Sequence, residues 1–295
     1  MFMRPRGWPR TKIEMLTVLE IIKKTTDFFS AKGIESSRLN AELLIGHALG
    51  LKRMQLYLQF ERPLAEPELE KIRPLVRRRG QREPLQYILG EVEFHGLKLK
   101  VDRRALIPRP ETELLVEFVV AACASPPQRI LDLGTGSGAI ALALARAFPS
   151  AVVNGVDLSD DALALAKENA TAAGLGERVS WVRSNWFEQI PAGSDFDLIV
   201  ANPPYLSAEE TAQAAPEVRG FEPVAALTSA DGGVADLREI SGKAQQFLTN
   251  GGLLALETGI GHHEELRAIL ATAGFTRVES RQDLTGRDRF VLAWK

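Results

Sequence analysis

The chain has 295 residues, of which 45% are hydrophobic and 25% charged, a composition typical of globular proteins with a large buried core. No apolar run reaches the length of a membrane span, and the single cysteine, Cys123, excludes an internal disulfide and a cysteine-based zinc site. The four histidines lack the spacing of metal ligands, so we expect no bound metal. Net charge is −2, but residues 1–110 carry 22 Lys and Arg against 13 Asp and Glu, whereas residues 111–295 carry 14 against 25. This asymmetry indicates two units with different surfaces.

The chain opens with a short basic segment, which a helical pattern follows. Residues 1–14 contain three arginines and two prolines but no apolar stretch of the secretory type, so we expect an extra or disordered tail. Residues 15–84 repeat apolar side chains at helical spacing, which predicts a small helical domain. Its second helix should be capped by Ser36 or Ser37 and should bury a face that includes His47.

The last helix of this domain should end in a basic cluster. It starts near Pro67 and finishes with Arg77, Arg78 and Arg79. Such a cluster could bind an acidic protein or nucleic acid. Alternatively it is the solvated surface of a helix, and charge alone does not separate the two interpretations.

Residues 85–105 change to a strand-like pattern. Leu97, Leu99 and Val101 alternate with lysines, and residues 93–96 can supply a turn. This predicts a β-hairpin that links the helical domain to the rest of the chain. Residues 107–110, Ile-Pro-Arg-Pro, then break the pattern before a further helix.

Residues 106–295 alternate between apolar strands and helices. The expected strands are 129–133, 151–156, 179–183, 196–201, 252–257, 275–281 and 289–294. This alternation predicts an α/β domain with a mostly parallel sheet and helices on both faces. Only a short connection separates the last two strands, so we expect them to pair antiparallel. An antiparallel strand at the end of such a sheet is typical of methyltransferases and not of dehydrogenases.

A glycine-rich loop follows the first of these strands and opens a helix. Glycines let the backbone turn tightly and approach a ligand closely. Gly134, Gly136 and Ala139 also satisfy the dinucleotide pattern G-x-G-x-x-A. The loop alone therefore leaves NAD, FAD and S-adenosylmethionine open, with a purely structural turn as a minor possibility.

Acidic residues around the loop favour S-adenosylmethionine. Asp132 would repel a pyrophosphate but suits the ammonium of a methionyl group, although it could instead cap the N–H groups of the loop. Asp157, at the end of the next strand, could hold ribose hydroxyls in either kind of site. Trp186 is placed to contact an adenine ring or, alternatively, to pack in the core.

The tetrad Asn202-Pro203-Pro204-Tyr205 follows an apolar strand, at the sheet edge where open α/β folds bind ligands. The prolines fix the backbone and remove two N–H donors, and Asn202 adds an acceptor oxygen, so the segment can grip an –NH₂ group. Tyr205 can stack on a planar amide or base. The tetrad thus predicts methylation of a planar –NH₂ group and leaves open whether it belongs to a base or an amide.

At this point the chain resembles a known family, the HemK/PrmC glutamine N5-methyltransferases that modify peptide chain release factors. The resemblance covers nearly the whole sequence from about Met15. It includes residues 37–44 (SRLNAELL) and 84–90 (PLQYILG) and, more specifically, residues 107–113 (IPRPETE), 221–223 (FEP) and 283–289 (DLTGRDR).

The resemblance implies a class I, Rossmann-like, seven-stranded methyltransferase domain at 106–295, with residues 15–84 as a substrate-docking domain and 85–105 as the linker. It implies a cytoplasmic enzyme that uses S-adenosyl-L-methionine to methylate the N5 nitrogen of the glutamine in the GGQ motif of class 1 release factors, modulating translation termination. It implies no membrane, no metal and no direct binding of nucleic acid.

The resemblance also implies which residues form the site. The cofactor residues are Asp132, Leu133, Gly134, Thr135, Gly136, Asp157, Trp186 and Asn202. The substrate residues are Asn202, Pro203, Pro204, Tyr205, Phe221 and Glu222, with Asn202, Pro203 and Tyr205 as catalytic residues. Asn185 departs from the acid that is common in the family, but its amide can still accept a hydrogen bond from adenine.

Four alternatives stay open. A related enzyme methylates glutamine in a ribosomal protein, and similar tetrads occur in nucleic-acid methyltransferases that act on adenine N6 or guanine N2. A DNA enzyme would ordinarily carry a target-recognition region for base flipping, which the helical front domain does not resemble. A non-catalytic nucleotide-binding module would leave the tetrad without a purpose. The glycine loop also permits a dinucleotide oxidoreductase.

Overall fold

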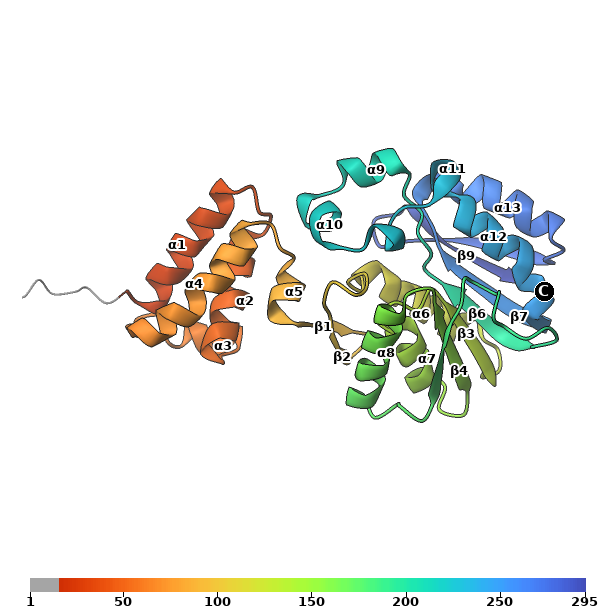
Figure 1. Cartoon of the computed structure of the whole chain (residues 1–295), viewed down its shortest axis with the longest axis horizontal. Coiled ribbons are helices and arrows are strands. Elements are labelled where there is room, and N and C mark those ends of the chain that lie inside the picture. The colour runs from red at the N-terminus through yellow and green to blue at the C-terminus, as the bar shows by residue number, and fades with distance from the viewer. Residues whose placement is uncertain (1–15) are drawn as a thin grey trace, which may run out of the picture. The chain divides into compact units, whose positions relative to one another are not determined.

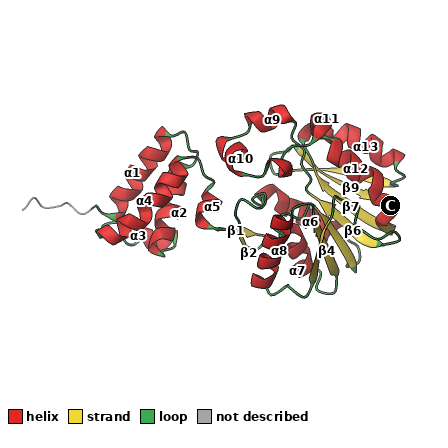
Figure 2. Ribbon diagram, viewed as in Figure 1, coloured by secondary structure: helices red, strands yellow, loops and turns green. Residues whose placement is uncertain are grey.

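The computed structural model describes residues 16–295, and the chain divides into two compact units between Leu89 and Gly90. The expected tail, residues 1–14, lies outside the described residues. Figures 1 and 2 show the elements of each unit. Within residues 16–295, no helix is both long enough and apolar enough to cross a membrane.

Unit 1 is a bundle of helices, as the sequence predicts. They are α1 (Val18–Ala31), α2 (Ser37–Leu49), α3 (Arg53–Tyr57), α4 (Glu66–Gly80) and α5 (Leu85–Leu89). Their apolar side chains meet in a single core, in which Ile22, Phe29 and Leu44 are almost fully buried. Residues 85–89 form a helix and not the start of the hairpin segment, because Leu85 and Ile88 pack on this core.

α2 buries a different and wider set of residues than the face that its sequence pattern predicts. His47 is exposed, whereas the buried residues of α2 are Asn40, Ala41, Glu42, Leu44, Ile45 and Gly46. α2 contacts all of the other four helices of unit 1, so neighbours cover more than one of its sides. Ser36 does occupy the N-cap position, but it has a left-handed conformation and no side-chain hydrogen bond to the described helix. Ser37 Oγ donates to the Ile34 carbonyl instead.

The basic end of α4 is only partly a surface. Arg77 is exposed, but Arg79 is 6% exposed and Arg78 is paired with Glu83. Arg79 Nε donates to Asn40 Oδ1 at 2.8 Å, and its Nη1 donates to the Glu83 carbonyl at 3.1 Å. Arg79 therefore joins α4 to α2, and an interpretation of the whole cluster as a docking surface is wrong for this residue.

Unit 2 begins with the expected hairpin. β1 (Glu91–Phe94) and β2 (Leu97–Lys100) pair antiparallel, with Phe94 opposite Leu97. The two residues between the strands, His95 and Gly96, have positive φ, as a tight hairpin turn requires. Phe94, Leu97 and Leu99 are buried in the core of unit 2, so the hairpin is packed as part of this unit.

In the part of the chain that the structure describes, seven strands form one sheet in the order β5-β4-β3-β6-β7-β9-β8. They are β3 (Arg129–Leu133), β4 (Val152–Asp157), β5 (Val179–Arg183), β6 (Phe196–Ala201), β7 (Leu248–Glu257), β8 (Arg277–Gln282) and β9 (Asp288–Trp294). β3 to β7 are parallel, whereas β9 runs antiparallel to both β7 and β8. The predicted mostly parallel sheet with a terminal antiparallel pair is confirmed.

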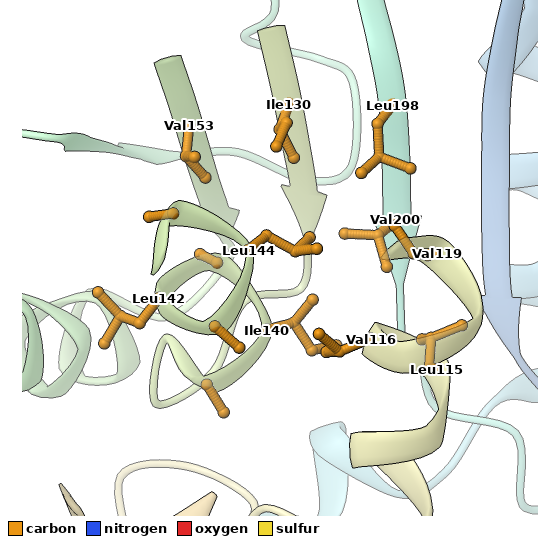
Figure 3. Packing of buried hydrophobic residues seen from close by; sticks show 14 of the residues in the cluster. Leu115, Val116, Val119, Ile130, Ile140, Leu142, Leu144, Val153, Leu198 and Val200 are labelled. Carbon is orange, nitrogen blue, oxygen red and sulfur yellow. The ribbon is translucent and has the colours of Figure 1, made fainter. Parts of the chain in front are cut away.

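Successive residues of each strand face opposite helical layers. On one face, Ile130, Leu198 and Val200 pack against α6 (Pro110–Ala122) and α7 (Ala139–Ala147), as Figure 3 shows. α8 (Asp160–Ala172) adds to the same layer. On the other face, strand residues pack against α12 (Ala235–Lys243) and α13 (His263–Thr272). Each fully buried aliphatic side chain stabilises such layers by about 1.5–3 kcal/mol.

The connection from β6 to β7 contains short helices that the sequence pattern does not predict. They are α9 (Ala208–Gln213), α10 (Pro216–Phe221), η1 (Val224–Ala226), α11 (Ala230–Gly233) and η2 (Ala244–Phe247), with η3 (Ile260–His262) after β7. Backbone hydrogen bonds between Leu206 and residues Leu227 and Ser229 close the first part of this connection into a loop. The tetrad, residues 202–205, directly precedes this loop, so the anchoring of Leu206 helps to hold the tetrad in place.

We expect Arg79→Met to destabilise unit 1, because it removes the buried guanidinium that donates to Asn40 Oδ1 and to the Glu83 carbonyl. The opening free energy of α2 and α4, measured by amide hydrogen exchange, should fall by about 2 kcal/mol. Arg77→Met is the matched control and should change it by less than about 0.5 kcal/mol. Equal protection in the two variants would show that Arg79 does not join the helices.

Candidate functional site

The site lies where the strand order reverses. β3 and β6 are neighbours, but the chain leaves β3 toward β4 on one side and reaches β6 on the other. Open α/β sheets bind ligands beyond the carboxyl ends of strands at such a point. A cavity of about 500 Å³ opens there. It is large enough for a nucleoside-sized ligand.

The glycine loop forms one wall of the cavity. Gly134, Thr135 and Gly136 line it, and the Thr135 N–H donates to the Val156 carbonyl at 2.9 Å. Gly134 has φ +68°, and a Cβ added there would lie 3.1 Å from the Trp186 ring. Only glycine therefore lets this backbone lie so close to Trp186 without strain.

Asp132 lies under the loop and not at the cavity surface. Its Oδ2 accepts from the Thr135 hydroxyl at 2.6 Å and from the Ala141 N–H at 3.1 Å. Its Oδ1 is buried and has no hydrogen-bond partner among the described residues. Burial, with a contribution from the charge of Asp157, raises the pKa of Asp132 to about 7. The residue thus fastens the loop to α7, and its carboxylate makes the cavity more favourable for a cation than for a pyrophosphate.

Asp157, at the end of β4, does line the cavity. Its two oxygens accept from the N–H groups of Gly136 at 2.8 Å and Ser159 at 2.9 Å. Each carboxylate oxygen has a further lone pair, which suits ligand hydroxyls. Burial raises the pKa of Asp157.

Trp186 and Asn185 line the cavity after β5. Trp186 has φ +46°, a left-handed conformation, and its Nε1–H donates to Asp236 Oδ1 at 3.1 Å. Asn185 Nδ2 donates to Glu188 at 3.0 Å. That bond uses the donor side of the Asn185 amide and leaves its oxygen as an acceptor for an adenine amino group.

Asn202, after β6, faces both the cavity and α6. Its Nδ2 donates to the Thr112 hydroxyl at 3.2 Å. Pro204 also lines the cavity, whereas Pro203 is buried behind it. The donor side of the Asn202 amide is thus engaged within the protein, and its acceptor oxygen is left for a ligand.

Tyr205 lies beside the cavity and does not line it. Its hydroxyl donates to Glu257 Oε1 at 3.3 Å, and the Arg289 guanidinium lies 5.4 Å from the centre of its ring. Burial, followed by the nearby charge of Glu257, raises the pKa of the phenol. Stacking of Tyr205 on an acceptor group stays a prediction.

Glu222 and Phe221 connect two segments around the cavity. Glu222 is 5% exposed and accepts from Arg109 at 2.6 Å and from the Ile107 N–H at 3.2 Å. Arg103 lies 4.8 Å from the centre of the Phe221 ring. These bonds hold the loop after β6 against residues 103–109, so both side chains support the site from outside it, while Pro223 reaches the lining.

Of the expected site residues, the cavity brings together Gly134, Thr135, Gly136, Asp157, Trp186, Asn202 and Pro204. Asp132, Leu133, Pro203, Tyr205, Phe221 and Glu222 lie behind or beside it. The lining also includes Leu106, Arg109 and Thr112, which the sequence analysis does not assign to the site. The signal for Arg109 and Thr112 is the specific segment 107–113, which precedes β3 and contributes to the cavity lining.

The residues present fit S-adenosyl-L-methionine. Beneath the loop a buried carboxylate oxygen has no partner among the described residues, Asp157 offers acceptors for ribose, and Trp186 offers an aromatic face. The same carboxylate disfavours a dinucleotide pyrophosphate. This combination beside the Asn202 oxygen can hold a methyl donor next to an –NH₂ acceptor.

Comparison with known proteins shows which family the chain resembles over its length. A family model for the PrmC N-terminal domain matches residues 20–90, and one for the methyltransferase small domain matches residues 110–218. Proteins named release factor glutamine methyltransferase are similar over most of the chain. The one from Chlorobaculum tepidum is 43% identical over 282 residues, covering 92% of this chain and 95% of its own. The one from Geobacter sulfurreducens is also 43% identical, and the match covers 95% of this chain and 97% of its own.

Solved structures support the fold. The catalytic domain of hMettl16, in complex with an RNA hairpin, has a TM-score of 0.55 at 18% identity and covers 78% of this chain and 80% of that one. The Thermus thermophilus 16S rRNA N2 G1207 methyltransferase, in complex with AdoMet and guanosine, has a TM-score of 0.51 at 20% identity. The match covers 70% of this chain and 49% of that one. Both show a class I methyltransferase fold.

We expect Asp157→Ala to weaken binding of S-adenosylhomocysteine at least about tenfold, because ribose loses its acceptors and Gly136 its anchor. Isothermal titration measures this directly. Asp160→Ala, whose side chain is 71% exposed on the first turn of α8, is the matched control and should bind like the wild type. Tight binding of NAD by the wild type, with none of S-adenosylhomocysteine, would contradict the assignment of the cavity.

Proposed function

This chain belongs to the release factor glutamine methyltransferase family, and we propose that it methylates the side-chain amide nitrogen (N5) of the glutamine in the GGQ motif of class 1 peptide chain release factors. It is an S-adenosyl-L-methionine-dependent methyltransferase. The modified glutamine modulates translation termination in this proposal. Because termination takes place on ribosomes, we place the enzyme in the cytoplasm.

One observation carries the proposal from family to chemistry, namely the orientation of the Asn202 amide. Its nitrogen is hydrogen-bonded to Thr112, which leaves the oxygen of this cavity-lining amide as an acceptor for a ligand. An acceptor beside a methyl-donor site selects a group with N–H bonds to donate. A primary amide is such a group.

The chain's residues act on the amide by holding its hydrogens. An amide nitrogen is a weak nucleophile, because its lone pair is delocalised into the carbonyl. When Asn202 Oδ1 accepts one N–H, electron density on the nitrogen rises. The prolines after it offer carbonyls without competing N–H donors, which suits the second N–H. The two bonds together aim the lone pair into the cavity.

Bound S-adenosyl-L-methionine supplies a sulfonium methyl group, whose carbon bonds to nitrogen as the sulfur–carbon bond breaks and its electron pair stays on sulfur. The methylated nitrogen then loses one proton to solvent, so the residues need not include a strong base. Positioning of this kind is worth up to about 7–11 kcal/mol in favourable intramolecular models. The chemistry that we propose needs no metal.

The relatives favour a protein substrate over nucleic acid. The two proteins named release factor glutamine methyltransferase are 43% identical to this chain, and the match covers 95% or more of their length. The two structural neighbours, one solved with an RNA hairpin and one with guanosine, share 18–20% identity with this chain, which reflects the common fold. We therefore propose that unit 1 docks the release factor and that direct nucleic-acid binding is not part of the function.

Incubation with isotope-labelled S-adenosyl-L-methionine and purified class 1 release factors, followed by peptide mass spectrometry, tests the proposal. The label should appear on the glutamine of the GGQ peptide, and a factor with this glutamine replaced should stay unlabelled. Label on another residue, or on ribosomal protein or RNA in a parallel incubation, would contradict it.

Asn202→Ala should lower kcat by about 10²–10³-fold, the size of effect seen when a group that stabilises a transition state is removed. Binding of S-adenosylhomocysteine by titration should change far less. Asn250→Ala replaces an exposed asparagine in β7 and serves as the control. Near-normal turnover by Asn202→Ala would show that the tetrad does not hold the acceptor amide.

A further inference from the structure

A buried carboxylate lies behind the Asn202 amide. Glu257, the last residue of β7, is 1% exposed and does not line the cavity. Its Oε2 accepts from the Thr112 hydroxyl at 2.7 Å, and its Oε1 accepts from the Tyr205 hydroxyl at 3.3 Å. The proposed chemistry assigns no role to this side chain, although burial of a carboxylate is costly for a protein.

Sheet register places Glu257 and Asn202 side by side. Ala201 of β6 lies opposite Leu256 of β7, so the next residues of the two parallel strands are Asn202 and Glu257. Alternate residues before them, such as Val200 and Ala255, face the layer that contains α6. The two polar side chains therefore point toward the first turn of α6, where Thr112 lies.

The single hydroxyl proton of Thr112 determines the orientation of the Asn202 amide. Because this proton is donated to Glu257, Thr112 Oγ1 has only lone pairs left for Asn202. A lone pair accepts from the Nδ2 group and repels the amide oxygen, so Nδ2 faces Thr112 at 3.2 Å. The amide oxygen then faces away from Thr112, on a residue that itself lines the cavity.

We propose that Thr112 and Glu257 are positioning residues, which hold the Asn202 amide with its oxygen toward the acceptor glutamine. The role rests on the proposed function, since it is the glutamine N–H that this oxygen receives. Shape alone would not fix the amide, because its oxygen and nitrogen are similar in size. The hydrogen-bond chain from Glu257 through Thr112 gives the amide one favoured direction.

The ionisation of Glu257 determines the direction of this chain. A protonated Glu257 could donate to Thr112, whose own proton would then turn to Asn202 and favour the reversed amide. Burial raises the pKa of Glu257, and the negative charge of Glu111 adds to this. The Thr112 and Tyr205 hydroxyls and the positive charge of Arg289 act in the opposite direction. These partners compensate part of the cost of burying the charge.

Thr112→Val and Thr112→Ser provide the test, because valine keeps the shape of threonine and serine keeps its hydroxyl. Thr112→Val should lower kcat for release factor methylation about tenfold or more, which corresponds to 1.4 kcal/mol or more. Its affinity for S-adenosylhomocysteine should be unchanged, and Thr112→Ser should retain most of the turnover. Equal turnover in the two variants, or a loss of cofactor affinity that matches the loss of kcat, would overturn the proposal.

Glu257→Gln tests the carboxylate. Glutamine offers one acceptor oxygen to two donors, so kcat should fall to a value between those of the wild type and Thr112→Val. When Glu257→Gln is combined with Thr112→Val, kcat should be little lower than in Thr112→Val alone, because both residues act through the same hydrogen-bond chain. Full turnover in Glu257→Gln, or independent losses in the double variant, would remove Glu257 from this role.

A spectroscopic measurement separates this inference from the identity of the substrate. The side-chain NH₂ signal of Asn202, assigned by NMR in the protein with bound S-adenosylhomocysteine, should show a hydrogen-bonded proton in the wild type and in Thr112→Ser. That signature should be lost in Thr112→Val. If the wild type does not methylate release factors but shows this pattern, only the proposed function falls. An identical signal in all three proteins would overturn the positioning role.

Discussion

The parallel pairing of β3 with β6 is the constraint on which the site depends. At this pair the chain leaves the sheet in opposite directions, so the connections after β3 and β6 diverge and a cavity remains at their carboxyl ends. The glycine loop follows one strand and the tetrad follows the other. The glycine loop and the tetrad therefore lie side by side for a topological reason, and the apolar layers on both faces of the sheet hold the two strands in register.

Buried carboxylates support both halves of this cavity from behind. Asp132 fastens the glycine loop to the start of α7, and Glu257 connects the loop after β6 to α6 through Thr112 and Tyr205. In each case burial raises the pKa of the carboxyl group, which means that the folded protein holds the charged form at a cost in free energy. Buried ionisable groups with shifted pKa values are common at functional sites. Here each of the two carboxylates orients polar groups of residues that line the cavity.

Much of the fold could be predicted because its signals are local. The strands of unit 2 are short apolar runs between turn residues, and their alternation with helices implies the parallel sheet. α2 was harder, because its burial depends on the helices around it and on Arg79 as a partner for Asn40. The short helices after β6 have too little apolar periodicity to be predicted. They depend on tertiary contacts such as the Glu222–Arg109 pair.

The site was predictable to a similar degree. Residues on the loop and tetrad could be placed from their position after strands, but whether a side chain lines the cavity depends on its neighbours, as Tyr205 and Glu222 show. Thr112 lies far from the tetrad in the sequence, and only the packing of α6 brings it to Asn202.

In the proposed reaction the Asn202 oxygen receives the N–H of the acceptor amide. A crystal structure with S-adenosylhomocysteine and a glutamine-containing release factor peptide tests it most directly. We expect the glutamine nitrogen to donate to Asn202 Oδ1 and to point toward the sulfur across the cavity. A glutamine amide bound away from Asn202, or an Asn202 amide that presents its nitrogen to the ligand, would contradict it.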